Sequence, residues 1–286
     1  MVDDGAVALP ADSHVHSEWS WDAPLGSMEG ACLQAARLGL PAIAFTEHLD
    51  HTVWTVPAAG PYATDYLTGL ADGEGRLTPP QLDRSGYLAE VERCRGRFPD
   101  LRILTGLEVG EPHWHAEACA TVIGAGRFDR VLGSLHCLRD GDGFTEPWGI
   151  YPHRDPADVI RDYLAEVATL VTNSELFSIL AHIDYPVRFW PERVGPFDPL
   201  AFEDEFRHAL RSTALTGKAL EVNTRIPLHA TVLAWWRDEG GDAVSFGSDA
   251  HLPSAVGHRF REAADMAEAH GFRPGKHPEG LWTRTD

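Results

Sequence analysis

The chain has 286 residues, of which 43% are hydrophobic and 23% charged, as is ordinary for a soluble globular protein with a large core. Its 24 basic and 43 acidic residues give a formal charge of −19, which argues against a surface that binds long nucleic acid through its phosphates. The four cysteines stand singly, no apolar stretch approaches the roughly 20 residues of a membrane span, and the first residues resemble no signal peptide, so we expect a cytoplasmic protein.

Seven short apolar runs follow one another along the chain, and each leads into residues that can bind a metal ion. Parallel strands of a closed sheet end at one mouth, so ligands that are far apart in sequence can converge there. The runs, with the residues that follow them, are 7–11 before Asp12, His14 and His16; 41–45 before Glu47 and His48; 103–107 before Glu108; 131–135 before His136; 179–181 before His182; 219–222 before Asn223; and 243–246 before Asp249 and His251.

The segments between the runs have helical periodicity, so strands and helices alternate as they do in an α/β barrel. Ser27 is suited to cap the first helix and Gly39 to end it, and Asp155 with Pro156 to open the third. We therefore predict a single α/β domain over residues 1–286, with its site at the C-terminal mouth of the strands. The predicted helices cover 27–38, 85–98, 155–171, 201–215, 230–239 and 255–270.

Three segments interrupt this alternation, namely 52–80, 139–155 and 185–199. They are rich in glycine and proline, and each begins just after a strand end that carries ligands. Barrels keep their substrate-binding loops at such positions. Four tryptophans in the predicted mouth loops could form an aromatic wall for an imidazole or a nucleobase, although anchoring of the loops explains any one of them equally well. They are Trp19, Trp54, Trp148 and Trp190.

The candidate ligands are imidazoles and carboxylates with no cysteine among them, a set that suits a hydrolytic cluster of Zn, Mn or Fe ions. In His14-Val15-His16 the two imidazoles lie on one side, because side chains alternate along an extended chain. An HxH pair alone often arises by chance. A second pair, His113 and His115, lies on the way into a helix and is not expected to bind metal.

The order of the motifs resembles the polymerase-and-histidinol-phosphatase (PHP) superfamily over about residues 9–262. Within it, the free-standing length and the motifs around Glu108, His136 and Asn223 resemble the histidinol-phosphate phosphatases. The motifs are Asp12-x-His14-x-His16-Ser17, Thr46-Glu47-His48, Gly106-Leu107-Glu108, Gly133-Ser134-x-His136, Ala181-His182-x-Asp184 and Gly247-Ser248-Asp249-Ala250-His251.

The resemblance implies a distorted seven-stranded β/α barrel and nine ligands around three divalent metal ions. The first ion would be held by His14, His16, Glu108 and Asp249; the second by Glu108, His136 and His182; the third by Asp22, His48 and His251. Asp22 stands where histidinol phosphatases often carry histidine, which favours a harder third ion such as Mn. Glu47 replaces an aspartate that is common in the superfamily, and we expect it to orient a ligand.

Such a site hydrolyses phosphate esters, because bridging metals lower the pKa of a shared water and neutralise the charge that develops on phosphate. Arginine side chains commonly bind phosphate beside metal ions, and we expect this role for Arg188, Arg225 and Arg139, each of which follows a strand end. Asp249 or His251 could assist proton transfer to the leaving alkoxide. Asp184 and Glu221 are expected to support the site rather than to bind metal.

These observations predict a metal-dependent phosphomonoesterase that acts on a small molecule through a metal-bridging hydroxide. L-histidinol phosphate is the first substrate to consider. Alternatives in the same class are a nucleotide or nucleoside-bisphosphate phosphatase, or a phosphatase of a specialised pathway. A phosphodiesterase or exonuclease is disfavoured by the acidic composition. A binding module without catalysis is disfavoured because all nine ligand positions are filled.

Overall fold

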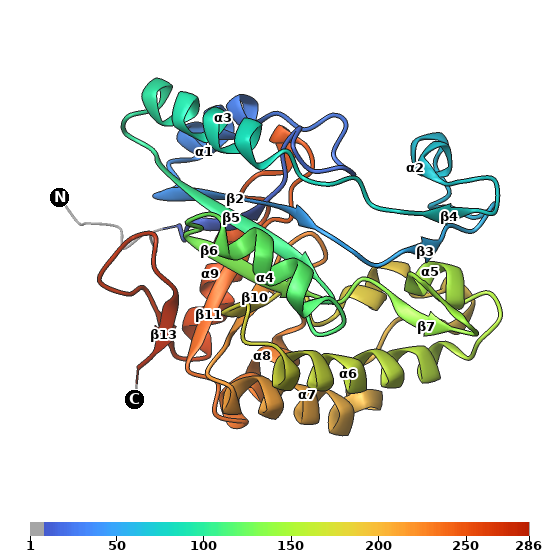
Figure 1. Ribbon diagram of the computed structural model, residues 1–286. Coiled ribbons are helices and arrows are strands. Elements are labelled where there is room, and N and C mark those ends of the chain that lie inside the picture. The colour runs from blue at the N-terminus through green and yellow to red at the C-terminus, as the bar shows by residue number, and fades with distance from the viewer. Residues whose placement is uncertain (1–8, 286) are drawn as a thin grey trace.

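The computed structural model describes residues 9–285, and its frame is one curled nine-stranded sheet with helices packed around it (Figure 1). The first seven strands of the sheet pair in parallel with their neighbours, and the last two join antiparallel. In sheet order the strands are β1 (Asp12–Val15), β2 (Ala42–Leu49), β5 (Arg102–Gly110), β6 (Arg130–Ser134), β9 (Ile179–Leu180), β10 (Ala219–Asn223), β11 (Ala243–Gly247), β13 (Trp282–Arg284) and β12 (Phe272–Arg273).

The sheet curls until its first strand lies beside the end of β11. Val15 forms a parallel bridge with Ala250. The backbone N–H of Asp249 donates to the carbonyl of His14 at 2.8 Å. This seam joins the part of the chain that carries the first predicted ligands to the part that carries the last.

Asp12 fastens the same seam with its side chain. Its carboxylate accepts hydrogen bonds from the backbone N–H groups of Ser248 at 3.0 Å and Gly257 at 2.9 Å. Asp12 is fully buried, and this burial raises the pKa of its carboxyl to about 6. A residue that the sequence placed among the possible ligands thus holds two strands together.

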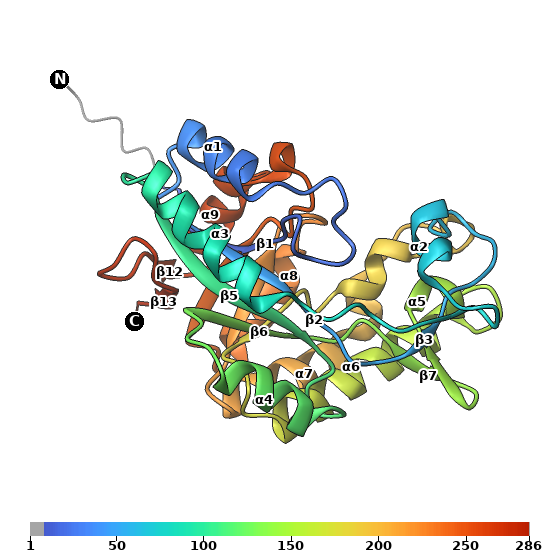
Figure 2. The same ribbon diagram turned by 45° about the horizontal axis from the view of Figure 1, so that its top comes forward.

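Helices cover the outside of the sheet. In Figure 1, α1 and α3 lie above it and α6 and α7 below it, and Figure 2 shows α8 and α9 from another side. The α-helices that flank the sheet are α1 (Met28–Leu38), α3 (Arg84–Arg97), α4 (Ala116–Gly124), α6 (Pro156–Asn173), α7 (Glu203–Leu215), α8 (Ala230–Asp238) and α9 (Phe260–Ala269).

Local sequence explains where these helices begin and end. The Ser27 hydroxyl accepts from the N–H of Gly30 at the start of α1, and Gly39 ends that helix with φ +70°. Asp155 caps α6 and Pro156 occupies its first position. The buried face of α6, which includes Val159, Tyr163 and Val167, packs into the main core.

The predicted α/β fold is confirmed, but the sheet is curled and has nine strands, the last two antiparallel, where a seven-stranded barrel was expected. Three further differences concern single elements. Some predicted ligands, among them His48 and Glu108, lie inside their strands rather than after them, because β2 stays paired with β5 up to Leu49 opposite Val109. The first strand begins at Asp12, and residues 7 and 8 of its predicted run lie outside the described residues. The helix predicted over 255–270 begins only at Phe260, because Arg259 has a left-handed φ of +53°.

The three predicted loop segments contain short structure that periodicity did not reveal. Their elements are the strands β3 (Trp54–Thr55), β4 (Arg76–Leu77), β7 (Leu138–Asp140) and β8 (Gly143–Thr145), the helices α2 (Asp65–Leu70) and α5 (Pro147–Ile150), and the 3₁₀ turns η1 (Tyr185–Phe189), η2 (Glu192–Val194) and η3 (Pro199–Phe202); a further turn, η4 (Pro253–Ala255), precedes α9. The antiparallel pair β3–β4 and the hairpin β7–β8 lie together beyond the end of β2 (Figures 1 and 2), where the Thr145 hydroxyl donates to the carbonyl of Thr55 at 2.5 Å. Within residues 9–285, no helix has the length and apolar character needed to span a membrane.

Candidate metal centre and substrate cavity

The nine residues predicted as ligands lie together at the C-terminal ends of the parallel strands. They form four overlapping groups, and within each group one nitrogen or oxygen from every member lies within 4.8 Å of the others. The groups are His16, Asp22, His48 and His251; His14, Glu108 and His182; His14, His16 and Asp249; and His48, Glu108 and His136. We call the nine residues the ligand cluster.

Glu108, near the end of β5, lies at the centre of the ligand cluster. Its Oε1 is 2.7 Å from Nε2 of His182 and 3.2 Å from Nε2 of His136. Its Oε2 is 3.2 Å from Nε2 of His14 and 3.3 Å from Nε2 of His16. Oε2 also lies 3.4 Å from Nδ1 of His48. The two oxygens of one carboxylate therefore face two different sets of imidazoles, an arrangement that suits a ligand shared by two metal ions.

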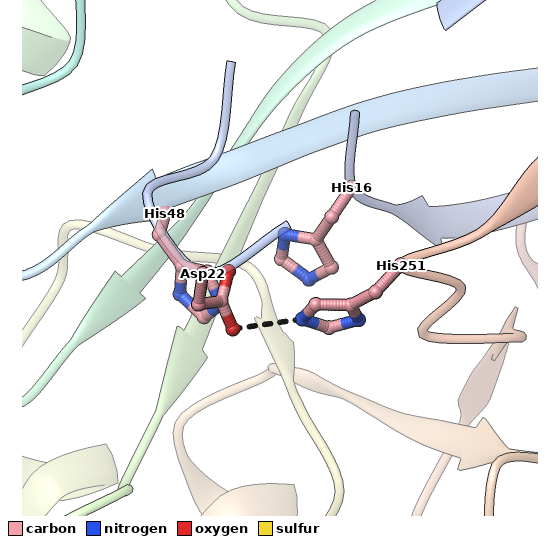
Figure 3. Close-up of side chains that lie close together, drawn as sticks. All are labelled: His16, Asp22, His48 and His251. Atoms are coloured by element: carbon pink, nitrogen blue, oxygen red, sulfur yellow. Dashed lines mark hydrogen bonds and ion pairs between the residues drawn. The ribbon is translucent and has the colours of Figure 1, made fainter. Parts of the chain in front are cut away.

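Asp22, in the loop after β1, brings a third set of donors together. Its Oδ2 is 2.9 Å from Nε2 of His251 and 3.3 Å from Nε2 of His48. Figure 3 shows these three side chains converging with that of His16. The His16 and His48 rings stack with centroids 4.3 Å apart. The Oδ1 atom of Asp22 is buried and accepts no hydrogen bond from the described part of the chain, although a buried carboxylate oxygen normally has a partner.

Asp249, which follows β11, connects the ligand cluster to two arginines. Its backbone has the unusual φ of +52°, and its Oδ1 lies 3.7 Å from Nε2 of His16. Arg188, on η1, forms an ion pair with Oδ2, and Nη1 of Arg225 lies 3.3 Å from Oδ1. Arg188 and Arg225 are therefore placed where an anion beside the cluster would meet them.

Arg139 is not placed with them. It lies on the hairpin β7–β8 with an exposed side chain, and its guanidinium stacks over the Phe144 ring at 4.9 Å instead of lining the cavity described below. Among the described histidines, His113 pairs with Glu166 at 2.7 Å and also lies outside the ligand cluster.

Carboxylates around the cluster fix its imidazoles. Glu221, on β10, places Oε1 at 2.6 Å from Nδ1 of His14, and its Oε2 accepts from the backbone N–H of His182 at 2.8 Å. Glu111 accepts from the backbone N–H of His136 at 2.6 Å and has the strained φ of +44°. Such outer contacts set the tautomer and direction of ligating histidines.

Glu47 acts on the cluster through Ser20. Its two oxygens accept from the hydroxyls of Ser17 at 2.5 Å and Ser20 at 2.6 Å. The Ser20 hydroxyl oxygen is in turn 2.9 Å from Nδ1 of His16. This contact agrees with the orienting role that the sequence suggested for Glu47.

Burial and neighbouring charges shift the pKa values of the ligand cluster, in opposite directions for Glu108 and His14 and in the same direction for His16. Burial would raise the pKa of the Glu108 carboxyl, but the imidazoles of His14, His136 and His48 hold it well below its usual range. Burial would lower the pKa of His14, but Glu221 and Glu108 raise it well above the ordinary value. Burial together with His251 and His48 lowers the pKa of His16 to about 3, so that imidazole is neutral and free to donate its lone pair.

A cavity of about 560 Å³ opens above the ligand cluster, within the range typical of small-molecule sites. Its floor is formed by members of the cluster together with Arg188 and Arg225. Its outer part is lined by aromatic side chains, namely Trp21, Trp54, Tyr62, Trp148, Tyr185 and Phe189.

Sequence reasoning anticipated only part of this wall. Trp54 and Trp148 line the cavity, whereas Trp19 and Trp190 do not. It missed Trp21, whose Nε1 donates to Asp50 at 2.8 Å. The sequence gives little indication that Trp21 lines the cavity, because a single aromatic residue in a loop is part of no periodic pattern.

Comparison with known proteins relates the chain to one family. Residues 12–225 match the model of the PHP domain family. The chain is 30% identical over 262 residues to the "Probable histidinol-phosphatase" of Deinococcus radiodurans, covering 88% of this chain and 90% of that protein. It is 26% identical over 271 residues to the histidinol-phosphatase of Lactococcus lactis subsp. lactis, covering 91% of each.

A solved structure shares the fold. The crystal structure of histidinol phosphate phosphatase from Lactococcus lactis subsp. lactis, in complex with zinc, L-histidinol and phosphate, superposes with a TM-score of 0.75. The match covers 95% of this chain and 98% of that one at 23% identity. The family model spans most of the chain, and the chain therefore belongs to the PHP domain family.

Proposed function

We propose that this protein is a metal-dependent phosphomonoesterase whose substrate is L-histidinol phosphate, which it hydrolyses to L-histidinol and phosphate. The observation that carries the proposal is the Glu108 carboxylate, whose two oxygens face separate sets of imidazoles on the floor of a small-molecule cavity. The relatives named histidinol-phosphatase, which match almost the whole chain, support the choice of substrate.

The donor set fits divalent metal ions. Hard carboxylates and borderline imidazoles suit Zn, Mn or Fe, and the buried Oδ1 of Asp22 lacks the partner that an ion would provide. We propose three ions, with His14, His16, Glu108 and Asp249 holding the first, Glu108, His136 and His182 the second, and Asp22, His48 and His251 the third. Bound there, the ions would supply Lewis acidity towards phosphate and a water of lowered pKa.

The residues of the chain then have distinct tasks. Arg188 and Arg225 bind the phosphate oxygens and orient the ester, since guanidinium groups match the geometry of phosphate. Asp249 or His251 would accept the proton that the attacking water gives up and pass it to the leaving alkoxide. Arg188 also holds the Asp249 carboxylate, so the grip on phosphate and the position of that residue are coupled.

We further propose that the seven parallel strands, closed by the seam between Val15 and Ala250, act as the barrel frame of a single domain over residues 1–286, with the metals at the C-terminal mouth. The compartment we propose is the cytoplasm. The small volume of the cavity, about 560 Å³, favours a metabolite over a nucleic-acid strand. A nucleotide phosphatase remains the second candidate, because the aromatic wall would also stack a base.

The experiment that tests the proposal is release of phosphate from L-histidinol phosphate by Mn- or Zn-loaded protein, beside 4-nitrophenyl phosphate. A kcat/KM of about 10⁴ M⁻¹s⁻¹ or more, far above that for 4-nitrophenyl phosphate, is expected. The Glu108→Ala variant serves as the blank for contaminating phosphatases. Equal rates on both esters would remove histidinol phosphate, and a mononucleotide panel would then test the second candidate.

A further inference from the structure

We propose that Glu146 determines substrate specificity, by binding a cationic N–H group at the end of the substrate that is remote from the phosphate. The inference rests on the proposed function only in taking the cavity as the site of a phosphate monoester. Glu146 lies in the cavity wall, directly after β8 and at the start of α5, in one of the segments that interrupt the barrel.

One oxygen of Glu146 is held and the other is free. Oε2 accepts hydrogen bonds from Nε1 of Trp148 at 2.9 Å and from the hydroxyl of Tyr185 at 3.1 Å. Oε1 accepts no hydrogen bond from any residue that the structure describes. The side chain is therefore fixed in direction while keeping an open acceptor, which is what recognition of a ligand donor requires.

Among the described carboxylates that line the cavity, Glu146 alone combines a free oxygen with the lack of a cationic partner. Asp22, Asp50 and Glu108 face imidazoles, Asp249 faces Arg188, and Glu111 accepts from neutral donors at both of its oxygens. The described donors to Glu146 are neutral, and its withdrawal from water raises its pKa to about 7 even with His136 in the same cavity. A carboxylate away from water without a cationic partner is costly, so a cation brought by the substrate is strongly favoured.

Tyr185 links this carboxylate to the ligand cluster. Its ring centroid lies 5.1 Å from those of both His136 and His182, and its hydroxyl reaches Glu146. The guanidinium of Arg188 lies over the same ring at 4.9 Å. A substrate whose phosphate is bound at the cluster and at Arg188 thus extends along Tyr185 and places its far end at Glu146.

The aromatic wall beside Glu146 suits such a group. Tyr62 packs against Phe189 with centroids 4.8 Å apart and against Trp148 at 6.1 Å. Aromatic faces attract cations and stack on flat rings. L-histidinol phosphate offers both an ammonium and an imidazole, and either can donate an N–H to Oε1 of Glu146.

The test is the Glu146→Gln variant, because glutamine keeps an acceptor for Trp148 and Tyr185 but removes the charge. We measure the ratio of kcat/KM for L-histidinol phosphate to that for 4-nitrophenyl phosphate, which has no cationic group. The ratio is expected to fall by about 10-fold to 100-fold, mainly through KM. Glu192→Gln, on the exposed turn η2 of the same mouth, is the matched control and leaves the ratio unchanged. An unchanged ratio in Glu146→Gln would overturn the proposal.

Two analogues identify the nitrogen. L-phenylalaninol phosphate keeps the ammonium without the imidazole, and 3-(imidazol-4-yl)propyl phosphate keeps the imidazole without the ammonium. Glu146→Gln should lower kcat/KM selectively for one of them. An equal loss of kcat/KM on both analogues and on 4-nitrophenyl phosphate would count against recognition of a cationic group by Glu146. If the wild-type protein does not favour L-histidinol phosphate, the proposed function fails separately. The inference about Glu146 is then decided by O-phosphoethanolamine against ethyl phosphate: a preference for the former that is lost in Glu146→Gln supports it, and no preference refutes it.

Discussion

Glu221 places one carboxylate oxygen 2.6 Å from Nδ1 of His14 and uses the other to accept from the backbone N–H of His182. A single buried side chain on β10 thus orients one imidazole and fixes the backbone of a second. Nε2 of both histidines is thereby directed towards Glu108.

We expect Glu221→Gln to weaken metal binding by about 10-fold to 100-fold, because loss of the carboxylate frees the His14 ring to rotate and lowers its basicity. Metal content after dialysis and titration of the metal-free protein would measure the effect. Glu166→Gln is the matched control, since Glu166 holds His113 at 2.7 Å outside the ligand cluster. Equal affinities in the two variants would contradict this role for Glu221.

Gly247 makes room for the same contact. A Cβ at this position would lie 2.0 Å from Oε1 of Glu221 and 2.6 Å from Cβ of His14. Gly247→Ala is therefore expected to lose about 1–3 kcal/mol of unfolding free energy and to release metal, because the carboxylate must move. Gly96→Ala in α3, where a Cβ meets nothing within 4 Å, should change stability by at most about 1 kcal/mol. Urea unfolding of the metal-free proteins would compare the two.

Arg188→Ala is expected to raise KM for phosphate esters by about 10-fold to 100-fold, because a charged hydrogen bond to phosphate is lost. Arg139→Ala provides the control, since that side chain is exposed on the β7–β8 hairpin. Steady-state kinetics, with metal content measured in parallel, would separate substrate binding from metal loss. If KM stayed at the wild-type value with full metal occupancy, Arg188 would have no part in binding.

Metal binding should release protons at neutral pH. Burial lowers the pKa of His136, but Glu108 and Asp50 outweigh burial and raise it to about 10, so the metal-free protein carries a proton there. A metal ion must displace that proton, and its affinity therefore rises with pH. Calorimetry in two buffers of different ionisation enthalpy would detect the release.

The same group gives the metal-free fold the opposite pH dependence. A raised imidazole pKa stabilises the folded state fully below the unfolded value of about 6.5, and this contribution is lost as pH rises through about 10. Thermal unfolding of the chelated protein between pH 7 and 9 would test this sign. Binding without proton release, or a metal-free protein that gains stability from this group over that interval, would contradict the assignment.

Most positions in the ligand cluster were predictable because their residues lie at or just after the end of a strand, and parallel strands end at the same mouth. His48 and Glu108, for example, lie side by side in the register of β2 and β5. Asp22, in the loop after β1, could be inferred only from family resemblance. The bridging role that we propose for Glu108 could be inferred only from family resemblance, since the strand pattern does not determine side-chain rotamers.

The cavity wall was less predictable, because its loops are positioned by contacts between distant parts of the chain. The Tyr62 hydroxyl donates to the carbonyl of Arg188, 126 residues away, and no local pattern foretells that contact. The same reason explains why Arg188 lines the cavity and Arg139 does not, although each follows a predicted strand end. Glu146 was overlooked because a lone glutamate beside a proline resembles any exposed loop residue.

The seam between β1 and β11 also has a consequence for how the protein is made. Because Asp12 is hydrogen-bonded to Ser248, 236 residues further on, the cluster cannot be completed until nearly the whole chain has been synthesised and its most distant ends have met. A nascent chain therefore exposes His14 and His16 long before Asp249 exists. The proposed metal ions can therefore all be bound only after the chain has folded to completion.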